Sequence, residues 1–272
     1  DEEEVLGVPN STMVKLVMEW LTSNLPPDGS IVIDDLSNQT SIIALQGPNS
    51  GKILEGVLGK ENAVQRFRCQ ELMSNDWGLQ GWIQGTGYTG EKGFEIFISN
   101  EDAPHLWGAF ISHSDVTPVG LGARDTLRLE KGYLLSGQDF LWPGIPEESE
   151  AFPEGFLART TSQTSVPFGL DLNHEFIGRA PLVESMASDS RLWGLECIER
   201  GPSPRPGHRV MGGPVESSEV IGYVTSGGPS PSKGMTGIAL AYLSKCNDGD
   251  EVWIQSSNRR RVRSVVTTPP FV

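Results

Sequence analysis

Two spacings of apolar residues alternate over the first half of the chain. Residues 11–22 (STMVKLVMEWLT) place apolar side chains around nearly the whole circumference of a helix, so we expect a helix that is buried. Ser11 or Thr12 is suited to cap its start, and Pro26-Pro27 follow its end. Residues 49–58 predict a second, shorter helix.

Alternating apolar and polar positions predict strands around these helices. Asn100, followed by Glu101 and Asp102, is typical of a helix start. Another helix is expected from about residue 118 to residue 132. Strands and helices therefore mix in one α+β region. The expected strands are residues 31–34, 41–47, 67–72, 78–84 and 94–99.

The pattern changes at residue 141. Residues 141–166 contain three prolines, four glutamates and no sustained period, which indicates a long loop. From about residue 190, short strands alternate with Gly/Pro turns, as in a small barrel or sandwich. We expect three parts: an α+β region at 1–140, a connecting segment at 141–188 and a C-terminal β-barrel domain at 189–272. The expected late strands are residues 192–199, 220–226, 237–243, 251–257 and 260–266.

The net charge of −14 over 272 residues restricts the partners. Nucleic acid is not expected as a partner, because phosphate binding needs a basic surface. One basic run, Arg259-Arg260-Arg261 with Arg263, falls in a strand-like stretch, where a solvated strand edge is favoured over a phosphate site. No apolar run approaches the ~18–20 residues of a membrane span, so no membrane association is expected.

Cysteine and histidine are few and scattered. Cys69, Cys197 and Cys246 have neither a metal-ligand spacing nor a disulfide framework, which predicts free thiols in a reducing compartment. The four histidines show no His-x-x-x-His or similar pattern, so no metal site is expected. We expect a cytoplasmic protein, or a mitochondrial matrix protein if the source is eukaryotic.

Residues 85–90 (GTGYTG) match the Gly-x-Gly-x-x-Gly pattern of dinucleotide sites. Such a site needs a helix directly after the glycines, where the pyrophosphate binds. Here the strand FEIFIS follows instead. The glycines are therefore interpreted as a hairpin turn.

Glu95 lies inside the strand that follows this turn. Phe94, Ile96 and Ile98 share one face of that strand, so Glu95 points away from the core, into solvent or into a pocket. For the residue taken alone, solvent is favoured. A carboxylate in a pocket could accept two adjacent N–H groups from the edge of a ring.

The helix at 118–132 has no clean polar face. Some of its charged residues Arg124, Asp125, Arg128 and Glu130 must therefore be partly buried. Buried charges need partners, so an internal ion-pair network is favoured over contact with a ligand.

The order and spacing of five segments resemble the glycine-cleavage T-protein family over nearly the whole chain. In that family, the glutamate of the Gly-Tyr-Thr-Gly strand and the first arginine of the Ala-Arg-Asp helix hold folate. The resemblance places these roles on Glu95 and Arg124, and Tyr88 matches the tyrosine of the same strand pair. Residues 8–21 (VPNSTMVKLVMEWL) resemble the family's Asn-Ala-…-Trp-Leu helix, which places a folate-proximal asparagine at Asn10. The segments are 44–54, 85–98, 120–140, 169–182 and 221–243.

The resemblance implies a multi-domain, folate-binding α+β fold that ends in a small β-barrel. The region 1–140 would bind folate, and the segment 141–188 would complete the folate channel. The implied reaction is that of a tetrahydrofolate-dependent aminomethyltransferase. It takes an aminomethyl group from the lipoyl arm of the H-protein, releases ammonia and leaves 5,10-methylenetetrahydrofolate. The implied partners are lipoylated H-protein and the other glycine cleavage components.

Some family features are not matched. The family's catalytic aspartate lies upstream of the asparagine helix, in a segment that is expected to be missing from this chain, so no catalytic residue is assigned. Asp34 and Asp35 mimic its motif at the wrong place, and a strand-end or turn role is favoured for them. Gly85 replaces the family's arginine before Thr-Gly-Tyr, and the loop at 141–166 is longer than the family pattern.

Two other functions remain open from the sequence. A folate-dependent demethylase of the dimethylglycine or sarcosine type is one, because residues 129–139 resemble those domains about as well. A non-catalytic folate-binding module is the other. The Lys-Gly-Cys-Tyr-x-Gly-Gln motif of such modules is not matched, since residues 131–138 (KGYLLSGQ) lack the cysteine.

Overall fold

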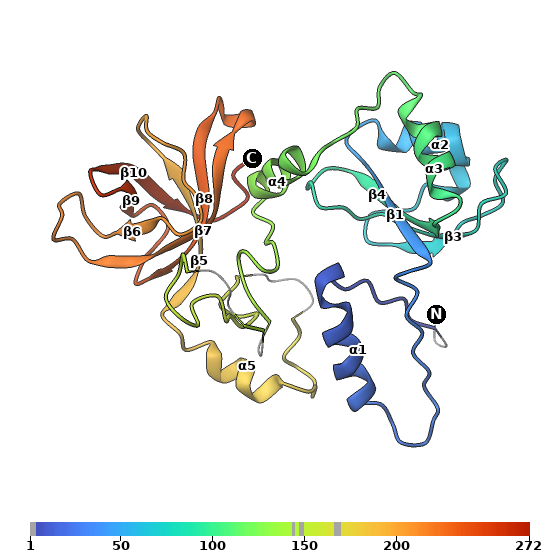
Figure 1. Ribbon diagram of the computed structural model, residues 1–272, viewed down its shortest axis with the longest axis horizontal. Helices are drawn as coiled ribbons and strands as arrows, with labels where there is room; N and C mark the ends of the chain where they lie inside the picture. The colour runs from blue at the N-terminus through green and yellow to red at the C-terminus, as the bar shows by residue number, and fades with distance from the viewer. Residues whose placement is uncertain (1–3, 143–144, 147–149, 166–169) are drawn as a thin grey trace. The chain divides into compact units, whose positions relative to one another are not determined.

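The computed structural model describes residues 4–142, 145–146, 150–165 and 170–272. Contacts within the chain divide it into two compact units. The first unit comprises residues 1–87 and 91–118, and the second comprises residues 88–90 and 119–272 (Figure 1). The expected division into three parts stays a prediction, because compactness alone does not define a domain.

The first unit is built on a four-stranded antiparallel sheet. Its order is β1 (Thr40–Gln46), β4 (Gly93–Ser99), β3 (Gly81–Gln84) and β2 (Cys69–Glu71). Four of the five predicted strands are thereby confirmed. The fifth is wrong: residues 31–34 form no strand, and the side chain of Asp35 instead accepts the backbone N–H of Ser37 at 2.9 Å in a turn.

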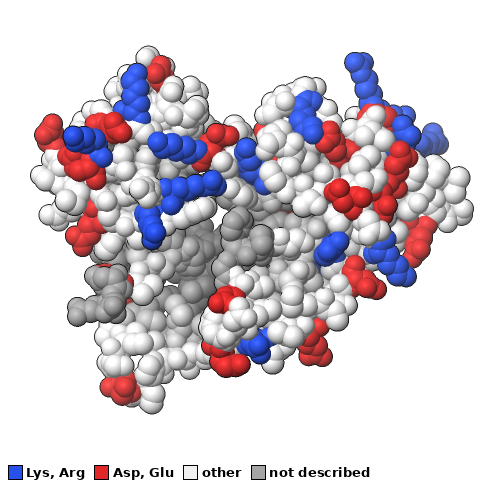
Figure 2. All heavy atoms as spheres, turned by 180° about the vertical axis from the view of Figure 1, so that it is seen from behind, with Lys and Arg blue, Asp and Glu red and all other residues white. Residues whose placement is uncertain are grey.

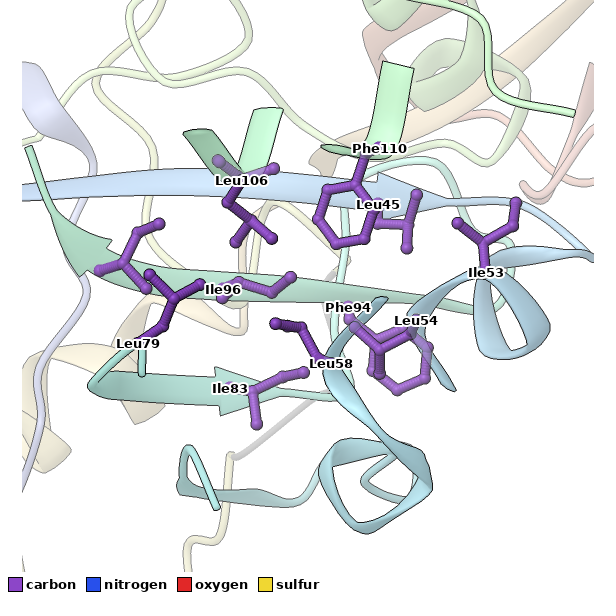
Figure 3. Close-up of a cluster of buried hydrophobic side chains, with 12 residues drawn as sticks. Leu45, Ile53, Leu54, Leu58, Leu79, Ile83, Phe94, Ile96, Leu106 and Phe110 are labelled. Carbon is purple, nitrogen blue, oxygen red and sulfur yellow. The ribbon is translucent and has the colours of Figure 1, made fainter. Parts of the chain in front are cut away.

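Two helices cover one face of this sheet and close a hydrophobic core. They are α2 (Ser50–Leu58), as predicted, and α3 (Ala103–Ile111). Phe94, Ile96 and Ile98 point into the core from β4, as their alternation predicts. Figure 3 shows Leu54 and Leu58 of α2, and Leu106 and Phe110 of α3, packed over the strands. The buried cluster comprises Ile43, Leu45, Ile53, Leu54, Leu58, Leu79, Ile83, Phe94, Ile96, Ile98, Leu106 and Phe110.

The N-terminal helix differs from its prediction. A short 3₁₀ turn, η1 (Ser11–Met13), precedes α1 (Val14–Ser23). The cap is the side chain of Asn10, which accepts from the backbone N–H of Thr12 at 3.2 Å. The expected burial is wrong, because no residue of α1 is buried. Apolar side chains around a helix predict that it packs against other residues, but they do not identify those residues.

The start of α3 also differs from its prediction. Asn100 does not cap the helix, since its side chain bonds to Ser41 and to the carbonyl of Asn38. Asp102 occupies the cap position, and its N–H is accepted by Ser99 Oγ at 3.1 Å. Asn100 is instead used to hold the end of β1 to the end of β4.

The second unit is built on a closed six-stranded antiparallel barrel, which confirms the predicted C-terminal barrel. The order around the barrel is β10, β5, β8, β7, β6, β9. The short strand β6 was not predicted, because three residues are too few for a pattern. The strands are β5 (Ser190–Cys197), β6 (Arg209–Met211), β7 (Val220–Ser230), β8 (Thr236–Ser244), β9 (Glu251–Ser257) and β10 (Arg260–Thr267).

Helix α4 (Leu121–Glu130) packs against β7 and β8 of this barrel. Leu129 joins a buried cluster there with Ile238 and Leu240. The other short elements of the chain are η2 (Lys60–Asn62) in the first unit, with α5 (Arg179–Ser185) and η3 (Pro231–Lys233) in the second.

The predicted loop at 141–166 forms neither helix nor strand in its described residues, while residues 143–144, 147–149 and 166 lie outside them. Phe152 and Phe156 stack at 5.4 Å, and Phe156 lies edge-on to Tyr223 at 5.1 Å. The guanidinium of Arg159 lies 4.3 Å from the ring centre of Tyr242. The loop therefore packs on the outer wall of the barrel through aromatic contacts.

In Figure 2, acidic and basic side chains are intermixed on the face shown. The basic run lies at the start of β10, where Arg260 to Arg263 pair with β9 and the pairing with β5 begins only at Ser264, and Arg259, Arg260 and Arg263 are exposed. Arg260 donates to the carbonyl of Arg200 at 2.6 Å, and Arg263 lies 3.6 Å from Glu251. Within the described residues, no helix is long and apolar enough to span a membrane.

Candidate functional site

The β3–β4 hairpin carries the carboxylate that the sequence singles out. Glu95 lies opposite Gln84 of β3, and the glycine-rich segment joins the two strands as the predicted turn. Glu95 is half-buried. Its Oε2 atom accepts from Thr86 Oγ1 at 2.5 Å and from Gln84 Nε2 at 3.1 Å. A carboxylate held by two side-chain donors has a fixed orientation, unlike one in open solvent.

The second oxygen of this carboxylate is the one that a ligand could use. Within the described part of the chain, Oε1 of Glu95 receives no hydrogen bond. A carboxylate oxygen has two lone pairs, so Oε1 and the remaining capacity of Oε2 can accept adjacent N–H groups. The arrangement suits a planar ring that offers two donors along one edge.

The amide of Gln46 sets the shape of the same hairpin. Its Nε2 atom donates to the carbonyls of Thr86 and Phe94, both at 3.1 Å. A Cβ atom at Gly87 or at Gly93 would collide with this amide. A larger residue at either position would therefore have to displace the Gln46 amide from these two carbonyls.

Tyr88 and Arg124 form a second cluster, inside the second unit. The guanidinium carbon of Arg124 lies 4.8 Å from the ring centre of Tyr88, in a cation–π contact. The Tyr88 ring stacks on Tyr133, with centroids 5.9 Å apart, and its hydroxyl donates to the carbonyl of Leu134. Burial raises the pKa of Tyr88 to about 12, so the phenol stays neutral and keeps its proton at physiological pH.

The charged residues of α4 divide into two groups. Arg124 and Asp125 are exposed, whereas Arg128 and Glu130 are buried. The ion-pair network expected from the sequence exists, and it is centred on Arg128, which pairs with Asp125 and Asp139. Arg124 remains available at the surface for a ligand. The sequence pattern could not tell these two arginines apart, since both lie on the same helix.

The structure brings the four sequence-predicted residues together only in part. Glu95 and Asn10 belong to the first unit, while Tyr88 and Arg124 belong to the second. Asn10 is exposed and has a structural task, since its side chain accepts from the N–H and the hydroxyl of Thr12. Contact of Asn10 with folate stays a prediction.

Comparison with known proteins identifies the family. The family model "GCVT N-terminal domain" matches residues 1–144, and the model "Glycine cleavage T-protein C-terminal barrel domain" matches residues 191–272. The chain belongs to the glycine-cleavage T-protein family. The barrel of the second model coincides with the closed barrel of β5 to β10.

Relatives of the T-protein family cover almost the whole chain. Aminomethyltransferases of Bacillus cereus and Bacillus anthracis are each 34% identical over 277 residues, covering 99% of this chain and 70% of the relative. The crystal structure of glycine cleavage system aminomethyltransferase T from Bartonella henselae matches with a TM-score of 0.67 at 28% identity. That match covers 86% of this chain, which spans 60% of the Bartonella chain.

The structure also shows residues that the sequence did not single out in this T-protein family chain. Gln84 and Thr86 hold Glu95, and the alternation in β3 could have pointed to Gln84, which shares the face of Glu95. Phe67 has a φ of 61° and an exposed ring, and its N–H donates to the carbonyl of Gly85 at 3.0 Å. A bulky residue in the left-handed region is strained, so the exposed ring beside the hairpin is a candidate for function.

Proposed function

We propose that this chain acts as a tetrahydrofolate-dependent aminomethyltransferase of glycine cleavage. It would move a one-carbon unit from an aminomethyl-lipoyl carrier protein to tetrahydrofolate and release ammonia. In the balanced reaction, the carbon leaves sulfur and the amino nitrogen and forms two bonds to folate nitrogens. The two folate N–H protons end on the lipoyl sulfur and in ammonia.

The observation that carries the proposal is the held carboxylate of Glu95. Thr86 and Gln84 fix Oε2, which leaves Oε1 to accept from a ligand. A pterin edge presents a ring N–H beside an amino group, and this pair of donors matches one carboxylate. The relatives named aminomethyltransferase support the choice of a folate ligand over other rings with such an edge.

The other candidate residues supply contacts of different kinds. Arg124 would support the bound folate by its positive charge, and Tyr88 would support it as a neutral ring with a fixed hydroxyl. Phe67 would offer an apolar surface to a planar ring. Asn10 would lie near the folate, as the family resemblance suggests. No residue of the chain is proposed as the catalytic aspartate.

The proposed reaction needs a protein partner. The chain would bind the lipoylated H-protein, whose arm delivers the aminomethyl group, and would work with the other glycine cleavage components. All three cysteines are free thiols. This state fits the proposed location in the cytoplasm, or in the mitochondrial matrix of a eukaryote.

Calorimetric titration with 5-formyltetrahydrofolate tests the binding site. Loss of a charged hydrogen bond costs ~1.5–3 kcal/mol, so Glu95→Gln should weaken binding about 10- to 100-fold. Glu71→Gln is the matched control, because it removes the same charge from an exposed position in the same sheet. Equal affinity of Glu95→Gln and the unchanged chain would refute the assignment of Glu95.

An activity assay tests the reaction. The chain should form 5,10-methylenetetrahydrofolate and ammonia when given an aminomethylated lipoyl carrier protein. Turnover only with dimethylglycine or sarcosine would instead identify a demethylase. Folate binding without turnover of either donor would indicate a binding module and would overturn the proposed enzyme.

A further inference from the structure

A fully buried ion pair lies beneath the Tyr88–Arg124 cluster. Arg128 and Asp139 both have 0% side-chain exposure, and their charged atoms Nη1 and Oδ2 are 2.8 Å apart. Asp139 also accepts from the hydroxyls of Thr225 and Ser226, at 2.5 and 2.6 Å. Arg128 donates in turn to Ser226 Oγ at 2.8 Å. The pair thus fastens the residues after α4 to strand β7 of the barrel.

Arg128 and Asp139 also form hydrogen bonds with the backbone on both sides of Leu134. Arg128 donates to the carbonyl of Tyr133 at 2.9 Å, and Asp139 accepts the N–H of Leu135 at 2.8 Å. Between these two fixed points, the carbonyl of Leu134 accepts the hydroxyl of Tyr88. The position of that carbonyl, and therefore of the Tyr88 hydroxyl, depends on the ion pair.

A second branch runs from the pair to Arg124. The Nε atom of Arg128 donates to Oδ1 of Asp125 at 2.7 Å. Asp125 is the chain neighbour of Arg124, whose guanidinium lies over the Tyr88 ring. Arg128 therefore holds the residue next to Arg124 on α4, and it also holds Tyr133, the residue before Leu134, whose carbonyl accepts the Tyr88 hydroxyl.

We propose that Arg128 and Asp139 are positioning residues for the folate site: they set the place of Tyr88 through the Leu134 carbonyl and that of Arg124 through Asp125. They do not touch the ligand. The proposal rests on the proposed folate function, because the position of Tyr88 affects binding only if Tyr88 contacts the folate. It also predicts that, in the ligand-free chain, the stacking of Tyr88 on Tyr133 depends on Arg128 and Asp139.

Glu130 offers a matched comparison on the same helix. It is buried, with 4% exposure, and accepts from Ser230 Oγ at 2.5 Å and from the backbone N–H and the hydroxyl of Ser232. Glu130 therefore fastens α4 to the end of β7 by hydrogen bonds of the same kind. None of these bonds reaches residues 133–135. A merely structural role would give Arg128 and Glu130 variants the same effect on folate binding.

The test compares variants of the 272-residue chain. They are Arg128→Lys, Tyr88→Phe, the double variant that combines these two substitutions, and Glu130→Gln. Lysine keeps the charge but lacks the planar fork that reaches Asp125, Tyr133, Ser226 and Asp139 together. Arg128→Lys should weaken binding of 5-formyltetrahydrofolate about 10-fold, and the double variant should be no weaker than the weaker single variant. Glu130→Gln should lower the unfolding midpoint and leave folate affinity within about 2-fold.

Several results would overturn the proposal. If the fold-losses of folate affinity of Arg128→Lys and Tyr88→Phe multiply in the double variant, the two residues act independently. If the unchanged chain binds no folate, the proposed function fails. The positioning proposal is then tested by the contact between the Tyr88 and Tyr133 rings in the chain without ligand. The nuclear Overhauser contact between Tyr88 and Tyr133 should then be lost in Arg128→Lys and kept in Glu130→Gln, and its persistence in Arg128→Lys would refute positioning. If Arg128→Lys does not fold, Asp139→Asn takes its place with the same expected results.

Discussion

Thr86 donates its hydroxyl hydrogen to Oε2 of Glu95 across the β3–β4 hairpin, at 2.5 Å. The bond joins a residue of the glycine-rich turn to a residue inside the following strand. Because the strand holds its own backbone firmly, the bond orients the carboxylate and the turn together.

Removal of this hydroxyl should weaken folate binding without unfolding the sheet. Thr86→Val keeps the shape of the side chain and deletes one hydrogen bond to a charged group, so affinity should fall about 5- to 10-fold. Titration with 5-formyltetrahydrofolate measures the change. Ser41→Ala, which deletes a hydroxyl bonded to Asn100 in the same sheet, should bind folate unchanged. Equal losses in the two variants would argue against orientation of Glu95 by Thr86.

Loss of Asp139 should destabilise the second unit strongly. Asp139→Ala leaves the buried charge of Arg128 with one of its two carboxylate partners, and removal of one member of a buried pair costs ~3–5 kcal/mol. Urea unfolding measures the free energy of unfolding. The double variant Arg128→Met with Asp139→Leu should lose less, since no unpaired charge remains. A double variant that is less stable than Asp139→Ala would contradict this account.

The stability of the chain should fall between about pH 10 and pH 12. Tyr88 has a folded pKa of about 12 against an ordinary value of 10, so the unfolded chain releases this proton first as pH rises. Tyr88 therefore favours the unfolded state across that window, and its contribution levels off above it, whereas burial raises the pKa of Tyr242 further still. The loss is expected below ~2 kcal/mol, because the ring is partly exposed and solvent screens the charge.

Tyr88→Phe provides the control for this pH dependence. Unfolding in urea at pH 9, 10 and 11 should show a smaller decline for the variant than for the unchanged chain. Spectroscopic titration of the four tyrosines should also lose one late-ionising phenol in the variant. An identical decline in both proteins would assign the pH effect elsewhere.

Alanine at Gly87 should disrupt the hairpin through its collision with Gln46. Overpacking of this kind costs ~1–3 kcal/mol, so Gly87→Ala should lower the free energy of unfolding by that amount and also weaken folate binding. The double variant Gly87→Ala with Gln46→Ala removes the colliding amide. Urea unfolding should show it more stable than Gly87→Ala; a further loss would mean that backbone conformation, and not the amide, requires glycine here.

Local patterns were sufficient for much of the fold. The alternation around Glu95 predicted which residues of β4 enter the core, because the side chains of a strand alternate by geometry alone. The turn after β3 was identified from its glycines and from the strand that follows them. Two helix caps were predicted at the wrong residue, Ser11 or Thr12 instead of Asn10 and Asn100 instead of Asp102, since several neighbouring polar residues can each cap a helix and only the folded backbone selects one.

The sequence by itself determined the family, the α+β class and the C-terminal barrel, and it proposed Glu95, Tyr88 and Arg124 as candidate folate-site residues. These depend on the order of motifs and on periodicity, which are properties of the chain. Only the tertiary structure decided that Arg128 is buried and Arg124 exposed, and that Thr86, Gln84 and Asp139 hold their partners in place. Such roles depend on which distant residues meet, as Arg128 meets Ser226 across 98 positions, and no local pattern carries that information.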